Sequence, residues 1–298
     1  MIVVTTPTGN IGSQVVKDLL AANEPVRVIA RDPLKLGAEV RAGVETVSGS
    51  SDDEGVLMRA LKGAESLFLV VPPSFTTTDD MAHYLQFTRP VCRAIKSQGV
   101  KRVVTVSGLG RRVAVPAGPV TDSFAKDAEI ERTGVDFRSL WCPSFMENML
   151  RQIDSLKHQG MFFLPNRPDL KAPMVATRDI AASGARLLLD RSWTGQRGLA
   201  VLGPEDLSFD DMAAIMTDVL GKPIRFQSVP GEVYKAQLMK FGASEAFAQS
   251  LVEMHAAKDN GLDNSEPRTP ENTTPTSFRQ WCEEVLKPAI AGEHGMNA

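Results

Sequence analysis

Residues 1–12 of the chain read MIVVTTPTGNIG, and this stretch decides the fold class. Ile2, Val3 and Val4 form a short apolar run that predicts a strand, and the turn after it leads into an amphipathic helix. A strand that runs into a glycine-bearing turn and a helix N-terminus is a common cradle for a nucleotide pyrophosphate, because free N–H groups and the helix dipole attract the anion. Residues 1–12 therefore predict a phosphate-binding turn.

The two glycines of this turn have separate roles. Gly9 lets the backbone approach the phosphates, and Gly12 lets the helix pack close to the strand. A complete dinucleotide fingerprint has a third, earlier glycine, but this chain has Thr6 there, so an ordinary strand–turn–helix is the alternative. The turn residues predicted to contact a cofactor are Thr6, Thr8, Gly9, Asn10, Ile11 and Gly12.

The composition narrows the class of protein. The chain has 298 residues, and its 33 Lys and Arg nearly balance 36 Asp and Glu to give a formal charge of −3. Without a basic stripe, nucleic-acid binding is not expected, and no apolar run is long enough to predict a membrane span. The first residues lack the features of a secretory signal, so the sequence predicts a cytoplasmic protein that acts on a small molecule. The sequence does not determine the oligomeric state.

Neither cysteine nor histidine points to a metal or a disulfide. The three cysteines are scattered, and Cys142 beside Pro143 is expected to be a buried packing residue rather than a reactive thiol. The four histidines, among them His294, form no set with the spacing of metal ligands, so no metal site is predicted.

Strand and helix patterns alternate along the first half of the chain. Repeated units of this length imply right-handed crossovers and a doubly wound parallel sheet, an α/β fold of the Rossmann type. From about residue 144 the alternation ends, which predicts a dinucleotide-binding domain at 1–150 and a smaller, mostly helical lobe at 151–298. A strand at 199–203 is expected to return to the first domain. The other strands are predicted at 2–4, 25–30, 44–48, 66–71, 100–106 and 135–142.

The ends of the predicted strands mark a candidate wall for cofactor and substrate. Ligands of doubly wound sheets lie beyond the carboxyl ends of the strands, so residues just after the strands are the ones to consider. Beyond the first turn, the residues predicted to lie there are Arg31, Val71, Pro72, Ser107, Pro143 and Phe145.

Arg31 bears on the choice of coenzyme. It lies nineteen residues after Gly12, at the end of the second predicted strand. NAD binding favours an acidic residue at this point, whereas the 2′-phosphate of NADP needs a cation. Arg31, with Lys35 one turn further on, therefore favours NADP(H). Two alternatives stay open, because Asp32 could bind the ribose and Arg31 could be a solvated surface charge.

Several segments together resemble the NmrA-like family of atypical short-chain dehydrogenases/reductases. The likeness covers residues 1–225 approximately. It implies a Rossmann-type sheet, an NADP-type cofactor and a C-terminal lobe that closes over the nicotinamide, but it identifies no substrate. The segments that carry the resemblance are TTPTGNIG at 5–12, ARDP at 30–33, TVS at 105–107, PSFMEN at 143–148 and TRDIA at 177–181.

The chain departs from its relatives in the group that would deliver a proton. Many relatives carry Lys or His eleven residues before the glycine that precedes the sixth strand; here that glycine is Gly134 and the counted residue is Ser123, with Lys126 out of register. The Tyr-x-x-x-Lys pair of the main superfamily is also absent, because neither Tyr84 nor Tyr234 has a lysine four residues later. The sequence therefore predicts a substrate whose reduced anion is delocalised, such as a quinone or an aromatic ketone.

Two serines are the catalytic candidates. Ser107 is expected to polarise the acceptor and Ser123 to touch a ligand; the alternative is that Ser107 caps the next segment and Ser123 caps its helix. The favoured function is an NADPH-dependent reductase of an apolar, quinone-like or aromatic carbonyl compound. The alternative is a non-catalytic NAD(P)H-binding regulator that senses redox state and acts through a protein partner. The residues that could line an apolar substrate pocket, or simply form core, are Trp141, Met146, Met149, Phe162 and Phe163.

Overall fold

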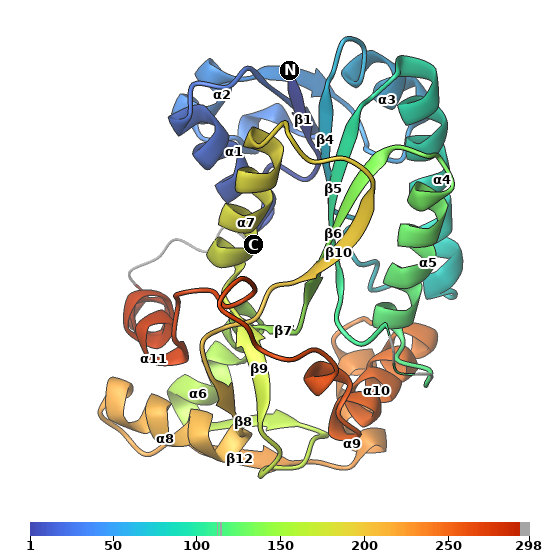
Figure 1. Ribbon diagram of the computed structural model, residues 1–298. Helices are drawn as coiled ribbons and strands as arrows, with labels where there is room; N and C mark the ends of the chain where they lie inside the picture. Colours follow the sequence, from blue (N-terminus) through green and yellow to red (C-terminus); the bar gives the residue numbers. More distant parts are fainter. Residues whose placement is uncertain (112, 114, 293–298) are drawn as a thin grey trace.

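A seven-stranded parallel sheet forms the centre of the protein (Figure 1). The computed structural model describes residues 1–111, 113 and 115–292. The strand order is β10-β6-β5-β4-β1-β2-β3, and every neighbouring pair is parallel. The predicted doubly wound α/β fold is thus confirmed. The strands are β1 (Ile2–Val4), β2 (Val26–Ala30), β3 (Glu45–Ser48), β4 (Ser66–Leu69), β5 (Arg102–Gly108), β6 (Asp136–Cys142) and β10 (Gln196–Ala200).

The strand order reverses at β1. The chain runs from β1 outward to β2 and β3, and then crosses to β4 on the other side of β1. Crossovers in opposite directions leave a crevice at the carboxyl ends of the two strands where the order changes. Residues 5–12 follow β1 directly, so the topology of the sheet places this turn at the crevice.

Helices cover both faces of the sheet (Figure 1). In β1, Ile2 and Val4 pack against the layer that contains α1 and α7, whereas Val3 packs against the layer of α3, α4 and α5. Successive side chains of a strand point to opposite faces, so a strand buried on both sides is apolar throughout. The helices of these layers are α1 (Gly12–Ala21), α2 (Ala38–Gly43), α3 (Glu54–Ala60), α4 (Asp80–Gln98), α5 (Pro119–Glu131) and α7 (Thr177–Leu189).

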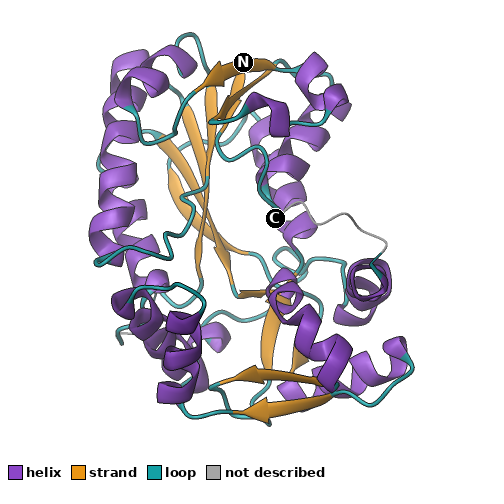
Figure 2. Cartoon of the chain, turned by 180° about the vertical axis from the view of Figure 1, so that it is seen from behind, coloured by secondary structure: helices purple, strands orange, loops and turns teal. Residues whose placement is uncertain are grey.

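After β6 the chain builds a second lobe below the sheet, where Figure 2 shows helices around short strands. These strands form a three-stranded sheet of order β11-β9-β7 and a two-stranded sheet of β12 and β8. The sequence predicted a mostly helical lobe. The short strands seen in the structure were not predicted, because strands of two to four residues are too short to show an alternating pattern. The elements are β7 (Ser144–Phe145), η2 (Met146–Gln152), α6 (Ile153–Gln159), β8 (Met161–Leu164), β9 (Ala172–Val175), β11 (Asp206–Leu207), α8 (Phe209–Leu220), β12 (Arg225–Ser228), α9 (Gly231–Lys240), α10 (Glu245–Asp259), α11 (Phe278–Trp281) and α12 (Lys287–Ala291).

Between its two passages through the lobe, the chain returns to the sheet. Helix α7 packs against α1, and β10 pairs with β6 at the edge of the sheet. The strand predicted at 199–203 is therefore β10, which begins at Gln196. The division of the chain at residue 150 stays a prediction, and residues 293–298 lie outside the described part.

Buried hydrogen bonds tie the lobe to the start of α7. The Asp179 carboxylate accepts hydrogen bonds from the Thr276 N–H at 3.0 Å and from the Thr276 hydroxyl at 2.8 Å. Glu147 accepts from the Thr177 N–H at 2.9 Å and from the Trp281 indole N–H at 3.2 Å. Because α7 packs on the sheet layer, these bonds hold the lobe against the carboxyl end of the sheet.

Candidate functional site

The turn after β1 depends on Gly12. A side-chain carbon on Gly12 would lie 2.3 Å from the Thr6 carbonyl oxygen, so only glycine allows the helix to pack this close to the strand. Thr6 itself has a φ of +51°, in the left-handed region. A β-branched residue is strained there, which explains why a complete fingerprint has glycine in this part of the turn.

The helix that follows the turn begins without a cap. Ile11 occupies the N-cap position of α1 and makes no side-chain hydrogen bond, and the first turn holds no acidic residue. Among the described residues, no acceptor lies within hydrogen-bond reach of the N–H groups of Asn10, Ile11 and Gly12. Thr8, Gly9 and Asn10 are exposed. Unpaired N–H groups at an exposed helix N-terminus form a site for an anion such as a phosphate.

Two exposed cations stand at the end of β2, next to β1. Arg31 and Lys35 form no ion pair with any residue that the structure describes. Asp32 is engaged instead: its carboxylate accepts a hydrogen bond from the Leu34 N–H at 3.0 Å and caps a short 3₁₀ helix. The local structure thus leaves the arginine guanidinium without a partner among the described residues, while one of the two Asp32 carboxylate oxygens is used in the cap.

The end of β4 forms the other side of the crevice. The Thr5 hydroxyl accepts a hydrogen bond from the Val70 N–H at 3.0 Å, which extends the contact between β1 and β4 past their last strand pair. Val71 is buried, and the carbonyl oxygen of half-buried Pro72 lies 2.9 Å from the His83 Nε2. Val71 and Pro72 therefore lie at the same edge of the sheet as the turn.

The structure brings the two candidate serines together. The hydroxyl oxygens of Ser107 and Ser123 lie 2.9 Å apart, and both side chains are buried. Ser123 also accepts a hydrogen bond from the Gly108 N–H at 3.0 Å and donates to the Val120 carbonyl oxygen at 2.6 Å.

Neither serine caps a helix, so the capping interpretation was wrong. Helix α5 begins at Pro119 with Gly118 as its N-cap, which puts Ser123 in the second turn. Because the hydrogen of Ser123 is used on Val120, the Ser107 hydroxyl donates to Ser123 and presents its lone pairs to a neighbour. In this arrangement the Ser107 hydroxyl oxygen can only accept further hydrogen bonds. To polarise a substrate carbonyl, the Ser107 hydroxyl must first give up its hydrogen bond to Ser123.

Lys126 is engaged inside the protein. Its ammonium group donates to the Thr105 hydroxyl at 2.7 Å and to the Val106 carbonyl oxygen at 2.6 Å, and it lies 3.1 Å from the Asp127 carboxylate. Burial lowers the pKa of Lys126, and the neighbouring Asp127 carboxylate opposes this shift. Cys142 is buried as expected, and burial raises the pKa of its thiol.

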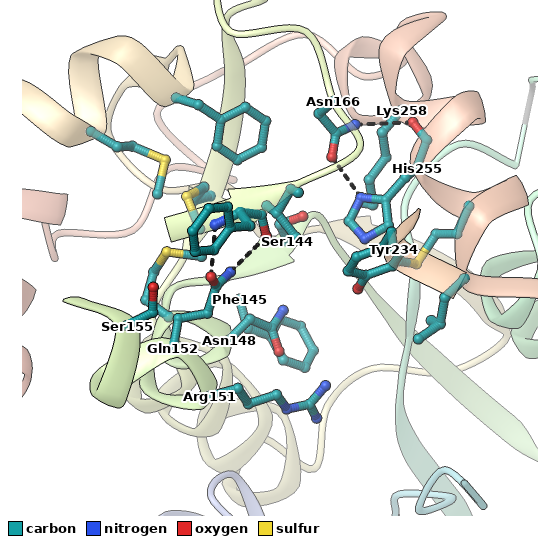
Figure 3. Close-up of a pocket in the computed structure, with 18 of the residues that line it drawn as sticks. Ser144, Phe145, Asn148, Arg151, Gln152, Ser155, Asn166, Tyr234, His255 and Lys258 are labelled. Atoms are coloured by element: carbon teal, nitrogen blue, oxygen red, sulfur yellow. Dashed lines mark hydrogen bonds between the residues drawn. The ribbon is translucent and has the colours of Figure 1, made fainter. Parts of the chain in front are cut away.

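A cavity of about 700 Å³ lies within the lobe, lined by residues between 144 and 263 and by Phe75 from the loop after β4. Ser144 and Phe145, which follow β6 after the buried Pro143, line it together with Asn148 and Arg151 of the next segment. Figure 3 shows these residues on one side of the cavity and α10, with His255, on the other. The predicted residue Phe145 thus belongs to the wall of a real cavity.

The predicted apolar pocket is partly correct. Met149 and Phe163 line the cavity, whereas Met146 and Phe162 are buried in the core of the lobe. Trp141 faces a different hollow, beside β10 and the segment 266–275. Its position in β6 explains this, because β10 is the strand that pairs with β6 at the edge.

Sequence reasoning missed the polar side chains at the far wall of the cavity. Asn166, Tyr234 and His255 come from three segments separated by more than twenty residues each. Nothing in their local sequence marks them, because only the packing of α9 against α10 and the hydrogen bonds from the loop after β8 to α10 bring them together.

The described part of the chain has neither a cluster of metal ligands nor a membrane-spanning helix. No group of three or more His, Cys, Asp or Glu side chains there could hold a metal ion, and His294 lies outside that part. None of the helices described has both the length and the apolar character needed to cross a bilayer.

The parallel sheet, its order reversal at β1 and the uncapped turn define a Rossmann-type fold. The model of the NmrA-like family matches residues 1–283, so the chain belongs to the NmrA-like family.

Relatives match over most of the chain. An NAD(P)H azoreductase of Xenophilus azovorans is 28% identical over 259 residues, which is 86% of each chain. A (4-alkanoyl-5-oxo-2,5-dihydrofuran-3-yl)methyl phosphate reductase of Streptomyces griseus is 29% identical over 95% of this chain and 97% of its own. The crystal structure of an NADPH-dependent quinone oxidoreductase of Escherichia coli complexed with NADPH superposes with a TM-score of 0.78, at 23% identity, over 96% of this chain and 100% of the other.

Proposed function

We propose that this protein is an NADPH-dependent reductase of a small, quinone-like aromatic compound. The observation that carries the proposal is the combination of unpaired N–H groups at Asn10, Ile11 and Gly12 with the unpaired Arg31 at the next strand end. The cavity that starts at Phe145 is the place for the substrate. The names of the relatives, an azoreductase, a furanone-type reductase and a quinone oxidoreductase, support the same class of activity.

The residues present fit a phosphorylated dinucleotide. Gly12 keeps the helix N-terminus close to the strand, where a side-chain carbon would collide with the Thr6 carbonyl oxygen. The N–H groups of the turn would bind the pyrophosphate, and Arg31, with Lys35 nearby, would bind the 2′-phosphate. When bound, the nicotinamide supplies the hydride for the reduction.

The cavity fits a flat aromatic substrate. Its volume of about 700 Å³ lies within the range of about 300–1,000 Å³ that is typical of small-molecule sites. Phe145 and Met149 offer apolar contact at its wall. A diaryl azo compound or an aryl quinone is of suitable size and polarity.

The described side chains explain why the substrate must tolerate a negative charge on its reduced form. Ser107 donates its hydrogen to Ser123, and Lys126 is held in the interior by Thr105 and Val106. With Ser107 and Lys126 engaged, we propose that the proton comes from water, which suits a product whose anion is delocalised over an aromatic ring.

The test is the oxidation of NADPH with a panel of quinones, azo dyes, aromatic ketones and enones. Turnover with a quinone or an azo dye supports the proposal. Tight binding of NADPH without turnover across the panel would contradict it and favour the non-catalytic redox-sensing regulator instead. The absence of an obvious acid makes that second function worth testing in the same experiment.

Ser107→Ala tests the serine pair. We expect turnover to fall about tenfold while the Kd for NADPH stays within about twofold, because Ser107 would orient the reacting groups rather than bind the phosphates. Steady-state kinetics and calorimetry measure the two effects. Unchanged turnover would remove Ser107 from the mechanism.

A further inference from the structure

His255 is held in one orientation at the far wall of the cavity. Its side chain lies on α10 and is only 8% exposed, and its Nδ1 lies 2.6 Å from the Asn166 side-chain oxygen. The Asn166 amide nitrogen donates to the His255 carbonyl oxygen at 3.1 Å and to the Asp259 carboxylate at 2.8 Å. These two bonds fix which end of the amide faces the imidazole ring (Figure 3).

The orientation of Asn166 determines where the proton of the imidazole lies. An amide oxygen can only accept a hydrogen bond, so Nδ1 of His255 must carry the hydrogen. Burial lowers the pKa of His255 to about 3, and the Lys258 ammonium shifts it in the same direction. The ring is therefore neutral at pH 7, and its Nε2 has a free lone pair.

The Nε2 atom of His255 is available to a ligand. The hydrogen bonds of the described residues use Nδ1 but not Nε2, although the side chain lines the cavity. Two other polar groups of the wall are engaged within the protein: Gln152 bonds both the N–H and the carbonyl oxygen of Phe163, and Ser155 donates to the Met161 carbonyl oxygen. His255 Nε2 is not among the fully buried side-chain atoms that lack a partner, so a donor in the cavity can reach it.

We infer that His255 accepts a hydrogen bond from the substrate, and that the substrate is an aromatic quinone-like molecule with a hydroxyl or N–H group on the ring remote from the reacting one. The reacting ring would lie at Phe145 and the donor at His255, on opposite sides of the cavity. This inference rests on the proposed function, because it names the substrate class of the same cavity.

The surroundings of His255 favour a neutral donor over a charged one. The Tyr234 ring meets the imidazole edge-on, with 5.2 Å between the ring centroids. Lys258 forms an ion pair with Asp263, and the Asp259 carboxylate accepts hydrogen bonds from the Arg167 backbone N–H and the Asn166 amide, so both charged side chains already have partners. A phenol loses little by leaving water for such a wall if it gains the bond to Nε2, whereas its methyl ether leaves Nε2 unpaired.

Binding of two biphenyls tests the hydrogen bond without any reduction. Calorimetry on the full chain compares para-hydroxybiphenyl with para-methoxybiphenyl, which differ in the donor and accept no hydride. We expect the hydroxyl compound to bind about tenfold more tightly, as one additional hydrogen bond allows. Equal affinities of the unmodified protein for both would overturn the inference without any variant.

His255→Phe keeps the size and flatness of the ring and removes its nitrogen atoms. We expect this variant to bind the two biphenyls with about equal affinity, while the matched control Tyr234→Phe on the same wall keeps the preference for the hydroxyl compound. A preference that survives in His255→Phe, or one that is lost in Tyr234→Phe instead, would assign the recognition to another group.

Two quinones separate this inference from the proposed function. We expect para-hydroxyphenyl-benzoquinone to be reduced with about tenfold higher kcat/KM than para-methoxyphenyl-benzoquinone, because its KM is lower. In His255→Phe we expect this difference in kcat/KM to vanish. If neither quinone is reduced but the biphenyl preference holds, the proposed reductase function is wrong and the hydrogen bond stands. If both are reduced equally and both biphenyls bind equally, the reductase function stands and the inference is wrong.

Discussion

Arg31 is the residue on which the coenzyme preference of the proposed function depends. It is exposed beside the strand that carries the turn, and its neighbour Asp32 is engaged as a cap. In Arg31→Ala we expect the affinity for NADPH to fall at least about tenfold and the affinity for NADH to change less than about twofold, because only NADPH has the 2′-phosphate. Calorimetry with both coenzymes measures this, and Arg41→Ala, an exposed arginine on α2, is the control. Equal losses for the two coenzymes would show that the guanidinium does not bind the phosphate.

Thr6 is a strained residue at the centre of the turn. Its φ of +51° is unfavourable for a β-branched side chain and carries no such free-energy penalty for glycine. Thr6→Gly should therefore raise the free energy of unfolding by about 0.5–1 kcal/mol, after allowance for the greater freedom of glycine in the unfolded chain. The matched control is Asn23→Gly at φ +57°, because asparagine tolerates this conformation better and should gain less. Urea unfolding of both variants tests the idea, and a larger gain at Asn23 would contradict it.

At the scale of the element, the two glycines of the strand–turn–helix unit have different roles: Gly12 is needed for packing and Gly9 for ligand binding. In Gly12→Ala the new carbon would lie 2.3 Å from a backbone oxygen, whereas in Gly9→Ala the nearest atom is 3.4 Å away. We expect Gly12→Ala to lower the free energy of unfolding by about 1–3 kcal/mol and Gly9→Ala to change it by less than about 0.5 kcal/mol. Gly9→Ala should still weaken NADPH binding, because the new methyl group crowds the phosphates. Urea unfolding measures the stability of the two variants, and calorimetry measures their affinity for NADPH. A Gly12→Ala protein more stable than Gly9→Ala would contradict the packing role of Gly12.

The elements of the sheet were predictable because their signals are local. Stretches of three to eight residues rich in apolar side chains, bounded by turn residues, predicted each strand from β1 to β6, and the turn chemistry around Gly12 predicted the start of α1. The short strands of the lobe and helix α2 were not identified, since elements of this length show no period. The sequence named both Ser107 and Ser123 as candidates but could not predict that they touch, because their contact depends on how α5 lies on β5.

At the scale of the whole molecule, the carboxyl group of Asp122 lies near acidic residues from segments that are distant in the sequence. Burial, together with Asp80, Asp79 and Glu253 from α4 and α10, raises its pKa from 3.8 to about 7. Between about pH 4 and pH 7 the folded protein holds this proton while the unfolded chain has released it, so stability falls as the pH rises through this window.

Asp122→Asn tests this junction. The amide is uncharged at every pH, so we expect the variant to be more stable than the wild type by about 1–2 kcal/mol at about pH 8 and equal to it at about pH 4. Urea unfolding at the two pH values measures the difference. Asp52→Asn, at an exposed position, serves as the control and should leave the free energy of unfolding unchanged at both pH values. A gain for Asp122→Asn that is the same at both pH values would contradict burial of the charge as its cause.

The sequence by itself determined the strands from β1 to β6, the turn at residues 5–12 and the cation at the end of β2, because each depends on residues that are neighbours in the chain. Tertiary structure alone decided that Ser107 donates to Ser123, that Lys126 is engaged in the interior, and that the pair of His255 and Asn166 faces Phe145 across one cavity. Side-chain contacts between segments far apart in sequence follow from packing, and packing leaves no periodic trace in the residues that it brings together.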